Sequence, residues 1–210
     1  MITLYDFPRA PSPRRARVIL AEKAVPHETV IVDLATREQM GEAFRAINPH
    51  CTVPALKLDD GTVLTDNAAI NAWAEAAYPA PPLMGTTPLE KAEIASWSTR
   101  IELEGFMAVA EALRNSAPAM ANRALTGPVD YAQIPELAAR GITRLRYFFA
   151  DLDAHLAGRD YIATDRFSLA DINAVIVVDF ARVVKVKPTE DHANIARWRD
   201  AMAQRPSFSL

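Results

Sequence analysis

A proline-rich stretch divides the chain into two parts of different character. Residues 79–88 show no periodic pattern of apolar residues, and they contain four prolines and a glycine: Pro79, Pro81, Pro82, Pro88 and Gly85. Because proline fixes φ and lacks a backbone N–H, neither a helix nor a central strand continues through such a segment. We therefore predict a linker at residues 79–88 between a domain at residues 1–78 and a domain at residues 89–210.

The cysteine and histidine content excludes several kinds of site. The chain of 210 residues has one cysteine, Cys51, which rules out an internal disulfide framework, a CxxC redox pair and a thiolate-rich zinc site. The 4 histidines are scattered, with no pair at metal-ligand spacing, so we expect no metal. A lone cysteine is also compatible with a reducing compartment.

Charge and hydropathy make nucleic acid and membrane poor candidates as partners. The formal net charge is −3, so the chain lacks the positive field that draws proteins to nucleic acid or anionic membrane. No apolar run approaches the roughly 20 residues that a membrane span needs, and Met1 leads directly into an alternating segment rather than a signal peptide. We expect neither partner and a cytoplasmic location.

The first part of the chain begins with strands and helices in alternation. Residues 2–7 have strand-like alternation, and residues 28–32 form a short β-branched run that favours a second, buried strand. Ser12 followed by Pro13 fits the N-cap and first position of a helix between these strands. Residues 36–47 read as a second helix.

A hairpin and a third helix complete the first part. Residues 53–58 and 62–65 read as strands on either side of an Asp-Gly turn. Asp66 and Asn67 then offer an N-cap to a helix over residues 68–77. The expected order is βαβαββα.

The second part is helical throughout. It contains four long helix-like segments and no strand-like alternation: residues 89–114, 134–156, 169–184 and 195–204. Before the third segment, Ser168 and Asp171 have the spacing of a capping box, and Phe167 and Ile172 that of a hydrophobic staple. A catalytic Ser–Asp pair is the competing interpretation, but no histidine stands beside it.

Two short motifs permit both a structural and a functional interpretation. Pro54 is either an ordinary edge-strand proline or a cis-proline that holds the backbone of Val53 toward a ligand. Asp66 and Asn67 either cap a helix or, with the exposed amides of that helix, hold the carboxylate and ammonium of an amino acid. The spacing alone leaves both questions open.

Taken together, these motifs resemble those of cytosolic glutathione transferases. The resemblance covers nearly the whole chain and rests on motifs in the order and separation of that family: Asn48-Pro49, Val53-Pro54, Asp59-Asp60-Gly61, Leu64 to Ile70, the proline-rich linker and the box from Phe167 to Ile172. It implies a thioredoxin-like N-terminal domain and an all-α helical-bundle C-terminal domain. It also implies a homodimer that uses glutathione as co-substrate.

The resemblance assigns glutathione contacts to four residues. Val53, which precedes the family's cis-proline at Pro54, would pair its backbone N–H and C=O with the cysteinyl part of glutathione like an added strand. Asp66 and Asn67 stand where the family usually has an acidic residue followed by serine, which grip the γ-glutamyl group. The asparagine departs from that pattern and offers an amide in place of a hydroxyl.

Ser12 is the residue that the resemblance favours as activator of the glutathione thiol. It follows the first strand and begins the first helix, where its hydroxyl and the positive end of the helix would lower the thiol pKa. The alternative is that Ser12 only caps the helix. We interpret Tyr5 as core, Cys51 as a bystander, and the three nearby arginines as a solvated helix face: Arg14, Arg15 and Arg17.

The function expected on these grounds is that of a glutathione transferase. The enzyme would bind glutathione, form its thiolate and direct it at a small hydrophobic electrophile. Glutathione-dependent disulfide reduction is a second possibility, and a non-catalytic transferase-like binding or regulatory protein is a third.

Overall fold

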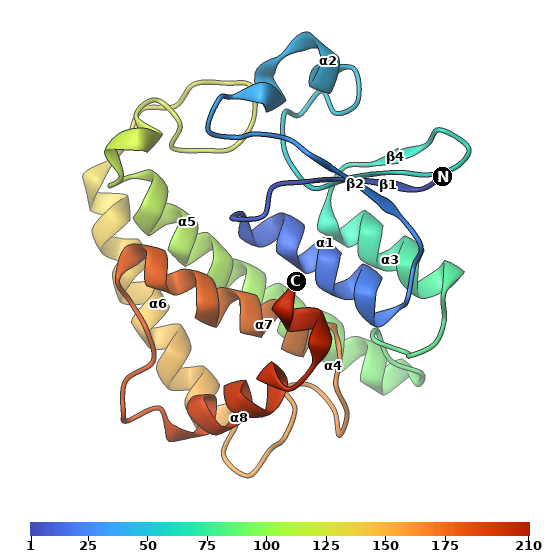
Figure 1. Cartoon of the computed structure of the whole chain (residues 1–210). Coiled ribbons are helices and arrows are strands. Elements are labelled where there is room, and N and C mark those ends of the chain that lie inside the picture. Colours follow the sequence, from blue (N-terminus) through green and yellow to red (C-terminus); the bar gives the residue numbers. More distant parts are fainter. The chain divides into compact units, whose positions relative to one another are not determined.

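The computed structural model describes residues 1–210, which form two compact units (Figure 1). The first unit comprises Met1–Pro81 with Thr126–Val129 and Leu210, and the second comprises Pro82–Leu125 and Asp130–Ser209. The chain thus passes from the first unit to the second inside the proline-rich stretch. None of the helices combines the length and the apolar character needed to cross a membrane.

The first unit is a four-stranded sheet with helices, in the expected order βαβαββα. The sheet has the strand order β2-β1-β3-β4, in which β1 is parallel to β2 and antiparallel to β3, and β4 is antiparallel to β3. This topology confirms the thioredoxin-like fold. The elements are β1 (Thr3–Asp6), α1 (Pro11–Glu22), β2 (Glu28–Ile31), β3 (Ala55–Lys57), β4 (Val63–Leu64) and α3 (Asn67–Ala77).

The second strand is present but is not buried as the sequence pattern suggested. All four residues of β2 are exposed, including Val30 at 43% and Ile31 at 50%. The reason is topological, because β2 lies at the edge of the sheet and pairs only with β1. Val32, just beyond the strand, turns inward and is 2% exposed.

The prediction of a single helix over residues 36–47 is wrong. The segment instead forms a 3₁₀ turn, η1 (Glu38–Met40), and one helical turn, α2 (Glu42–Arg45). Gly41 separates them with an extended backbone, φ −72° and ψ 157°. Only Gln39 and Phe44 of the two turns are buried, so no continuous apolar stripe exists to hold a longer helix against the sheet.

Lys23 fastens the end of α1 to the end of α3. Its ammonium is fully buried, donates to the carbonyl oxygens of Tyr78 at 2.9 Å and Pro81 at 2.7 Å, and forms an ion pair with Glu75. An ammonium has three donors, and all three have a partner here. The last turn of α3 and the start of the proline-rich stretch are therefore held to the first helix.

The second unit is a bundle of helices, as expected. The first long segment runs continuously through a widened π-helical turn, at which Gly105 lets the chain pack closely on Val177. The 169–178 portion of α7 is buried on all sides and forms the centre of the bundle. The helices are α4 (Pro88–Arg100), η2 (Ile101–Phe106), α5 (Met107–Arg114), α6 (Pro135–His155), α7 (Leu169–Phe180) and α8 (Ala193–Ala203).

The capping box at the start of α7 is confirmed, and it extends into a wider network. Oδ2 of Asp171 accepts hydrogen bonds from the backbone N–H and the hydroxyl of Ser168, both at 3.0 Å. Oδ1 accepts from the N–H of Ile162 at 3.0 Å and from Nε1 of Trp198 at 3.1 Å. Because its four acceptor sites are all used within the core, Asp171 has a structural role rather than a catalytic one.

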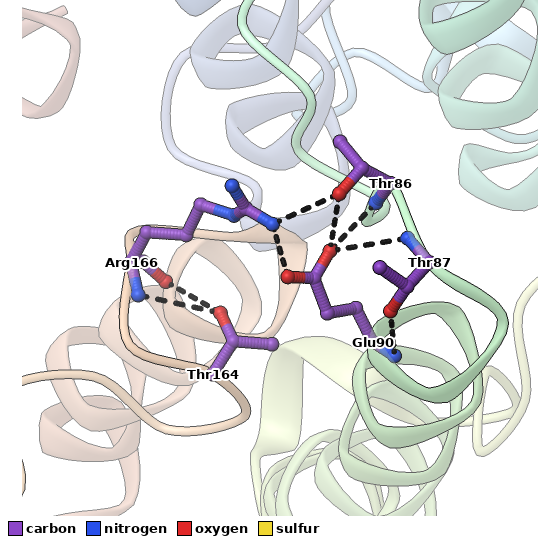
Figure 2. Close-up of polar contacts among 5 residues, drawn as sticks. All are labelled: Thr86, Thr87, Glu90, Thr164 and Arg166. Atoms are coloured by element: carbon purple, nitrogen blue, oxygen red, sulfur yellow. Dashed lines mark hydrogen bonds and ion pairs between the residues drawn. The ribbon is translucent and has the colours of Figure 1, made fainter.

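A second polar cluster holds the start of α4 (Figure 2). Thr87 and Glu90 form a capping box, and Oε2 of Glu90 also accepts from the N–H and hydroxyl of Thr86, both at 2.7 Å. Arg166, from the loop before α7, forms an ion pair with Glu90 and donates to the Thr86 hydroxyl at 3.1 Å. The hydrogen bonds from Arg166 and Thr86 lower the pKa of Glu90 to about 2, so this carboxyl stays ionised.

Candidate functional site

The register of the sheet brings the candidate residues of the first unit to one end of the sheet. Strand β1 ends at Asp6, while β3 begins at Ala55, opposite Tyr5. Strand β4 ends at Leu64, opposite Leu56. Three segments therefore leave the sheet at the same end: the one after β1, the one after β4 and the one before β3. These segments carry Ser12, Val53-Pro54 and Asp66-Asn67.

Ser12 does not cap α1, contrary to the sequence interpretation. The helix begins two residues earlier than expected, at Pro11 rather than Pro13, because the fixed φ of Pro11 suits the first helical position, and Ala10 is the N-cap with an extended backbone. Ser12 is the second residue of the helix, and its hydroxyl makes no capping bond. Instead, Ser12 Oγ accepts a hydrogen bond of 3.4 Å from Nη2 of Arg15.

The arginines of α1 are not simply a solvated face. Arg15 is 8% exposed, although it lies only one turn from Ser12. Arg17 donates to Oδ1 of Asp6 at 2.6 Å and to the carbonyl oxygen of Pro8 at 3.1 Å. Asp6 is 2% exposed, so this ion pair fixes the turn between β1 and α1 from within. The interpretation of this basic run as a solvated helix face is therefore wrong for Arg15 and Arg17.

The Val53-Pro54 peptide bond is cis. Val53 lies just before the first residue of β3, and neither its backbone N–H nor its C=O makes a hydrogen bond within the chain. A free N–H and C=O at this position can pair with an extended ligand as a strand would.

Asn48 holds the loop that leads to this peptide bond. Its Nδ2 donates to the carbonyl oxygen of Thr52 at 2.8 Å and to the Thr52 hydroxyl at 3.1 Å, while its Oδ1 accepts from the N–H of His50 at 3.0 Å. Asn48 itself is completely buried. The sequence did not point to this role, although an asparagine side chain often forms the hydrogen bonds that the backbone groups of a turn need. Cys51, in the same loop, is buried and free.

Asp66 is the N-cap of α3, as expected. Its Oδ1 accepts from the N–H of Ala69 at 2.9 Å, and its Oδ2 has no partner within the chain. The next residue, Asn67, has a buried Oδ1 that also lacks a hydrogen-bond partner. Two acceptor oxygens without partners thus lie at the start of α3, beside the N–H groups that open a helix. No three His, Cys, Asp or Glu side chains of the chain gather as metal ligands would.

Both parts of the chain match known protein families. Residues 10–77 match the family described as glutathione S-transferase, N-terminal domain, and residues 118–206 match glutathione S-transferase, C-terminal domain. Glutathione S-transferase 2 of Saccharomyces cerevisiae is 35% identical over 207 residues, which cover 97% of this chain and 86% of the yeast protein.

Solved structures give the same picture. A glutathione S-transferase domain-containing protein from Marinobacter aquaeolei VT8 has a TM-score of 0.89 and 32% identity, over 98% of this chain and 99% of that one. A glutathione transferase homologue from sulfitobacter, crystallised with bound glutathione, has a TM-score of 0.82 and 26% identity, over 100% of this chain and 95% of that one. The similarity extends over both units.

Proposed function

This chain belongs to the glutathione S-transferase family and is a glutathione transferase, and on that premise we propose how its first unit holds and activates glutathione. Ser12, Val53, Asp66 and Asn67, which lie at one end of the sheet, each receive a contact in this proposal. The single observation that supports the proposal is that the backbone N–H and C=O of Val53 and Oδ1 of Asn67 have no hydrogen-bond partner within the chain.

The cysteinyl part of glutathione pairs with the backbone of Val53. The N–H and C=O of Val53 have no partner within the chain. An extended ligand can therefore accept a hydrogen bond from this N–H and donate one to this C=O, as a strand next to β3 would. Pro54 places no donor at the next position, so the pairing ends there. This contact orients the ligand's thiol without requiring any particular side chain.

The γ-glutamyl group lies at the start of α3. Its ammonium donates to Oδ2 of Asp66 and Oδ1 of Asn67, the two acceptors that lack partners. Its carboxylate accepts from the first N–H groups of α3, where the helix dipole favours negative charge. Asparagine replaces the serine that is usual in the family, but it still presents an oxygen to the ammonium.

Ser12 donates its hydroxyl proton to the glutathione sulfur. The hydrogen bond from Arg15 occupies a lone pair of Ser12 Oγ and leaves the proton free to point at the ligand. A free thiol has a pKa of about 8.5, and a donor and the positive end of α1 lower that value, so that thiolate forms at neutral pH. The thiolate then attacks the electrophilic carbon. With a chloronitroarene, a C–S bond forms, a C–Cl bond breaks and chloride leaves.

Replacing the Ser12 hydroxyl tests this assignment. In Ser12→Ala we expect the rate of chloronitroarene conjugation to fall by about 10- to 100-fold, because one donor to the developing thiolate is lost. The pKa of the bound thiol, read from thiolate absorbance against pH, should rise by about 1 pH unit or more. Ser209→Ala, which removes an exposed hydroxyl at the chain end, is the matched control. Full conjugating activity in Ser12→Ala would show that another group activates the thiol.

We extend the proposal to the second substrate, the assembly and the location. The electrophile is a small hydrophobic compound, the protein is a homodimer, and it acts in the cytoplasm. A buried free cysteine and the absence of disulfides fit a reducing compartment. Light scattering on the purified protein measures the assembly directly, and a monomer at micromolar concentration would contradict it.

A further inference from the structure

The chain enters the first unit a second time, through a short segment of the connection between α5 and α6. Residues Thr126–Val129 belong to the first unit, whereas Leu125 before them and Asp130 after them belong to the second. Three of these four residues are exposed, so the segment does not serve to fill a hydrophobic core. We call Thr126–Val129 the strap.

The strap packs on the loop that leads to Val53. Gly127, within the strap, has a φ of 111°, a conformation that residues with a side chain rarely adopt. A Cβ at this position would lie 3.6 Å from the carbonyl oxygen of His50, so the backbone of the strap lies against the backbone of the loop. This carbonyl oxygen accepts no hydrogen bond within the chain. The strap therefore contacts the loop by packing, shortly before Val53.

The loop is strained and needs support from its surroundings. Cys51, next to His50, has a φ of 56° although it is not a glycine. A residue in this left-handed region costs free energy, and the conformation persists only where neighbouring groups fix it. Asn48 supplies part of the support, since its Oδ1 accepts from the N–H of His50 and its carbonyl oxygen accepts from the N–H of Cys51, both at 3.0 Å. These bonds hold two N–H groups and leave the carbonyl oxygen of His50 to the strap.

The two ends of the strap are fixed by neighbouring residues of the second unit. Nη1 of Arg114, at the end of α5, donates to the carbonyl oxygens of Arg123 at 2.8 Å and Leu125 at 3.4 Å. The N–H of Ala124, before the strap, donates to the carbonyl oxygen of Tyr131, after it, at 3.2 Å. The strap is thus the tip of a loop whose ends are held together, as in the compact surface loops that often have a function.

We propose that the strap braces the strained loop and keeps the backbone of Val53 in place for glutathione, with Arg114 as a positioning residue that acts through the strap. The inference rests on the proposed contact between Val53 and the cysteinyl part of glutathione. A loop that is already in its bound conformation loses less freedom when the ligand binds, so the brace raises the affinity without touching glutathione.

Two matched glycine variants test the brace. Gly127→Val and Gly61→Val both place a β-branched residue at a positive φ, 111° and 88°, but nothing lies within 4 Å of a Cβ at Gly61. In Gly127→Val we expect the dissociation constant of glutathione, measured by calorimetry, to rise about tenfold, because the loop spends less time in its binding conformation. The KM for glutathione in chloronitroarene conjugation should rise likewise, with kcat at saturating glutathione unchanged. Gly61→Val should bind glutathione as the unchanged protein does.

Amide hydrogen exchange of the ligand-free protein tests the strap without glutathione. The amides of His50 and Cys51 should exchange about tenfold faster in Gly127→Val than in Gly61→Val, because the loop opens more often. Arg114→Gln, which releases the ends of the strap, should change exchange and affinity in the same direction. Arg146→Gln, at an exposed position of α6, is its control.

The outcomes separate this inference from the function on which it rests. Unchanged exchange at His50 and Cys51 in Gly127→Val would overturn the brace. Faster exchange with unchanged glutathione affinity would overturn its part in binding. If the unchanged protein bound no glutathione at millimolar concentration, the proposed function itself would be wrong, whereas normal binding in every variant would contradict only the strap.

Discussion

A single buried carboxylate, that of Asp171, makes the stability of the helical unit depend on pH. Burial raises its pKa from the ordinary 3.8 to about 6, although four hydrogen bonds from Ile162, Trp198 and Ser168 oppose the change. Between these two values the folded chain binds a proton that the unfolded chain does not. The contribution of Asp171 to stability is therefore fully present below about pH 4 and is lost as the pH rises through about 6.

Asp171→Asn should remove this dependence. We expect the free energy of unfolding of the unchanged protein, minus that of the variant, to fall by about 2 kcal/mol between pH 4 and pH 7, which is most of the value that corresponds to the change in pKa. Denaturant titrations across this range measure it. Asp130→Asn, which changes an exposed carboxylate, is the control. A difference that stays constant with pH would mean that Asp171 does not titrate in this range.

Residues of the candidate site could be identified from the sequence where their roles depend on neighbours along the chain. Asp66 caps the helix that follows it, and the Ser168–Asp171 box spans four consecutive residues. The burial of Arg15 and Arg17 could not be interpreted in this way, because it depends on how α1 packs in the fold, as the ion pair between Arg17 and Asp6 of β1 illustrates. Ser12 lies two positions further into the helix than expected, since Pro11 and Pro13 both suit the start of a helix.

At the level of secondary-structure elements, Lys23 joins α1 to α3. Lys23→Met should lower the free energy of unfolding by about 3–5 kcal/mol, because it removes two buried hydrogen bonds to carbonyl oxygens and the ion pair with Glu75. Denaturant unfolding measures the loss. Lys57→Met, on an exposed position of β3, should change it by less than about 0.5 kcal/mol. If Lys23→Met costs less than about 1 kcal/mol, the buried contacts of this ammonium do not join α1 to α3.

Close packing of α5 on α6 depends on Gly141. A Cβ at this position would lie 2.6 Å from the carbonyl oxygen of Ala108 and 2.7 Å from the N of Ala112, both of them backbone atoms that cannot move alone. Alanine is favoured over glycine in helices by about 1 kcal/mol, but overpacking costs about 1–3 kcal/mol or more.

Gly141→Ala should therefore destabilise the protein despite its better helix propensity. Thermal unfolding should show a lower midpoint, and the far-ultraviolet circular dichroism should remain that of a helical protein. Ala150→Gly, at an exposed position of the same helix, measures the propensity effect alone. A higher midpoint in Gly141→Ala would show that the two helices can separate without cost.

For the whole molecule, the division into a mixed unit and a helical unit reflects two periodicities in one chain. Alternation with a period of two and β-branched runs mark the strands of the first unit, and apolar stripes with helical spacing mark the second. The proposed glutathione contacts all belong to the first unit, at one end of its sheet.

The sequence by itself determined the order of elements, the helical nature of the second unit and the caps at Asp66 and Ser168, because each depends on side chains within a few positions of one another. Only the tertiary structure decided that β2 is an exposed edge strand, that residues 36–47 break at Gly41, and that Arg15 and Arg17 face inward. It also decided which groups near Val53 and Asn67 remain without partners. The physical reason is that burial and hydrogen-bond pairing depend on residues far apart in the chain, and local patterns do not record them.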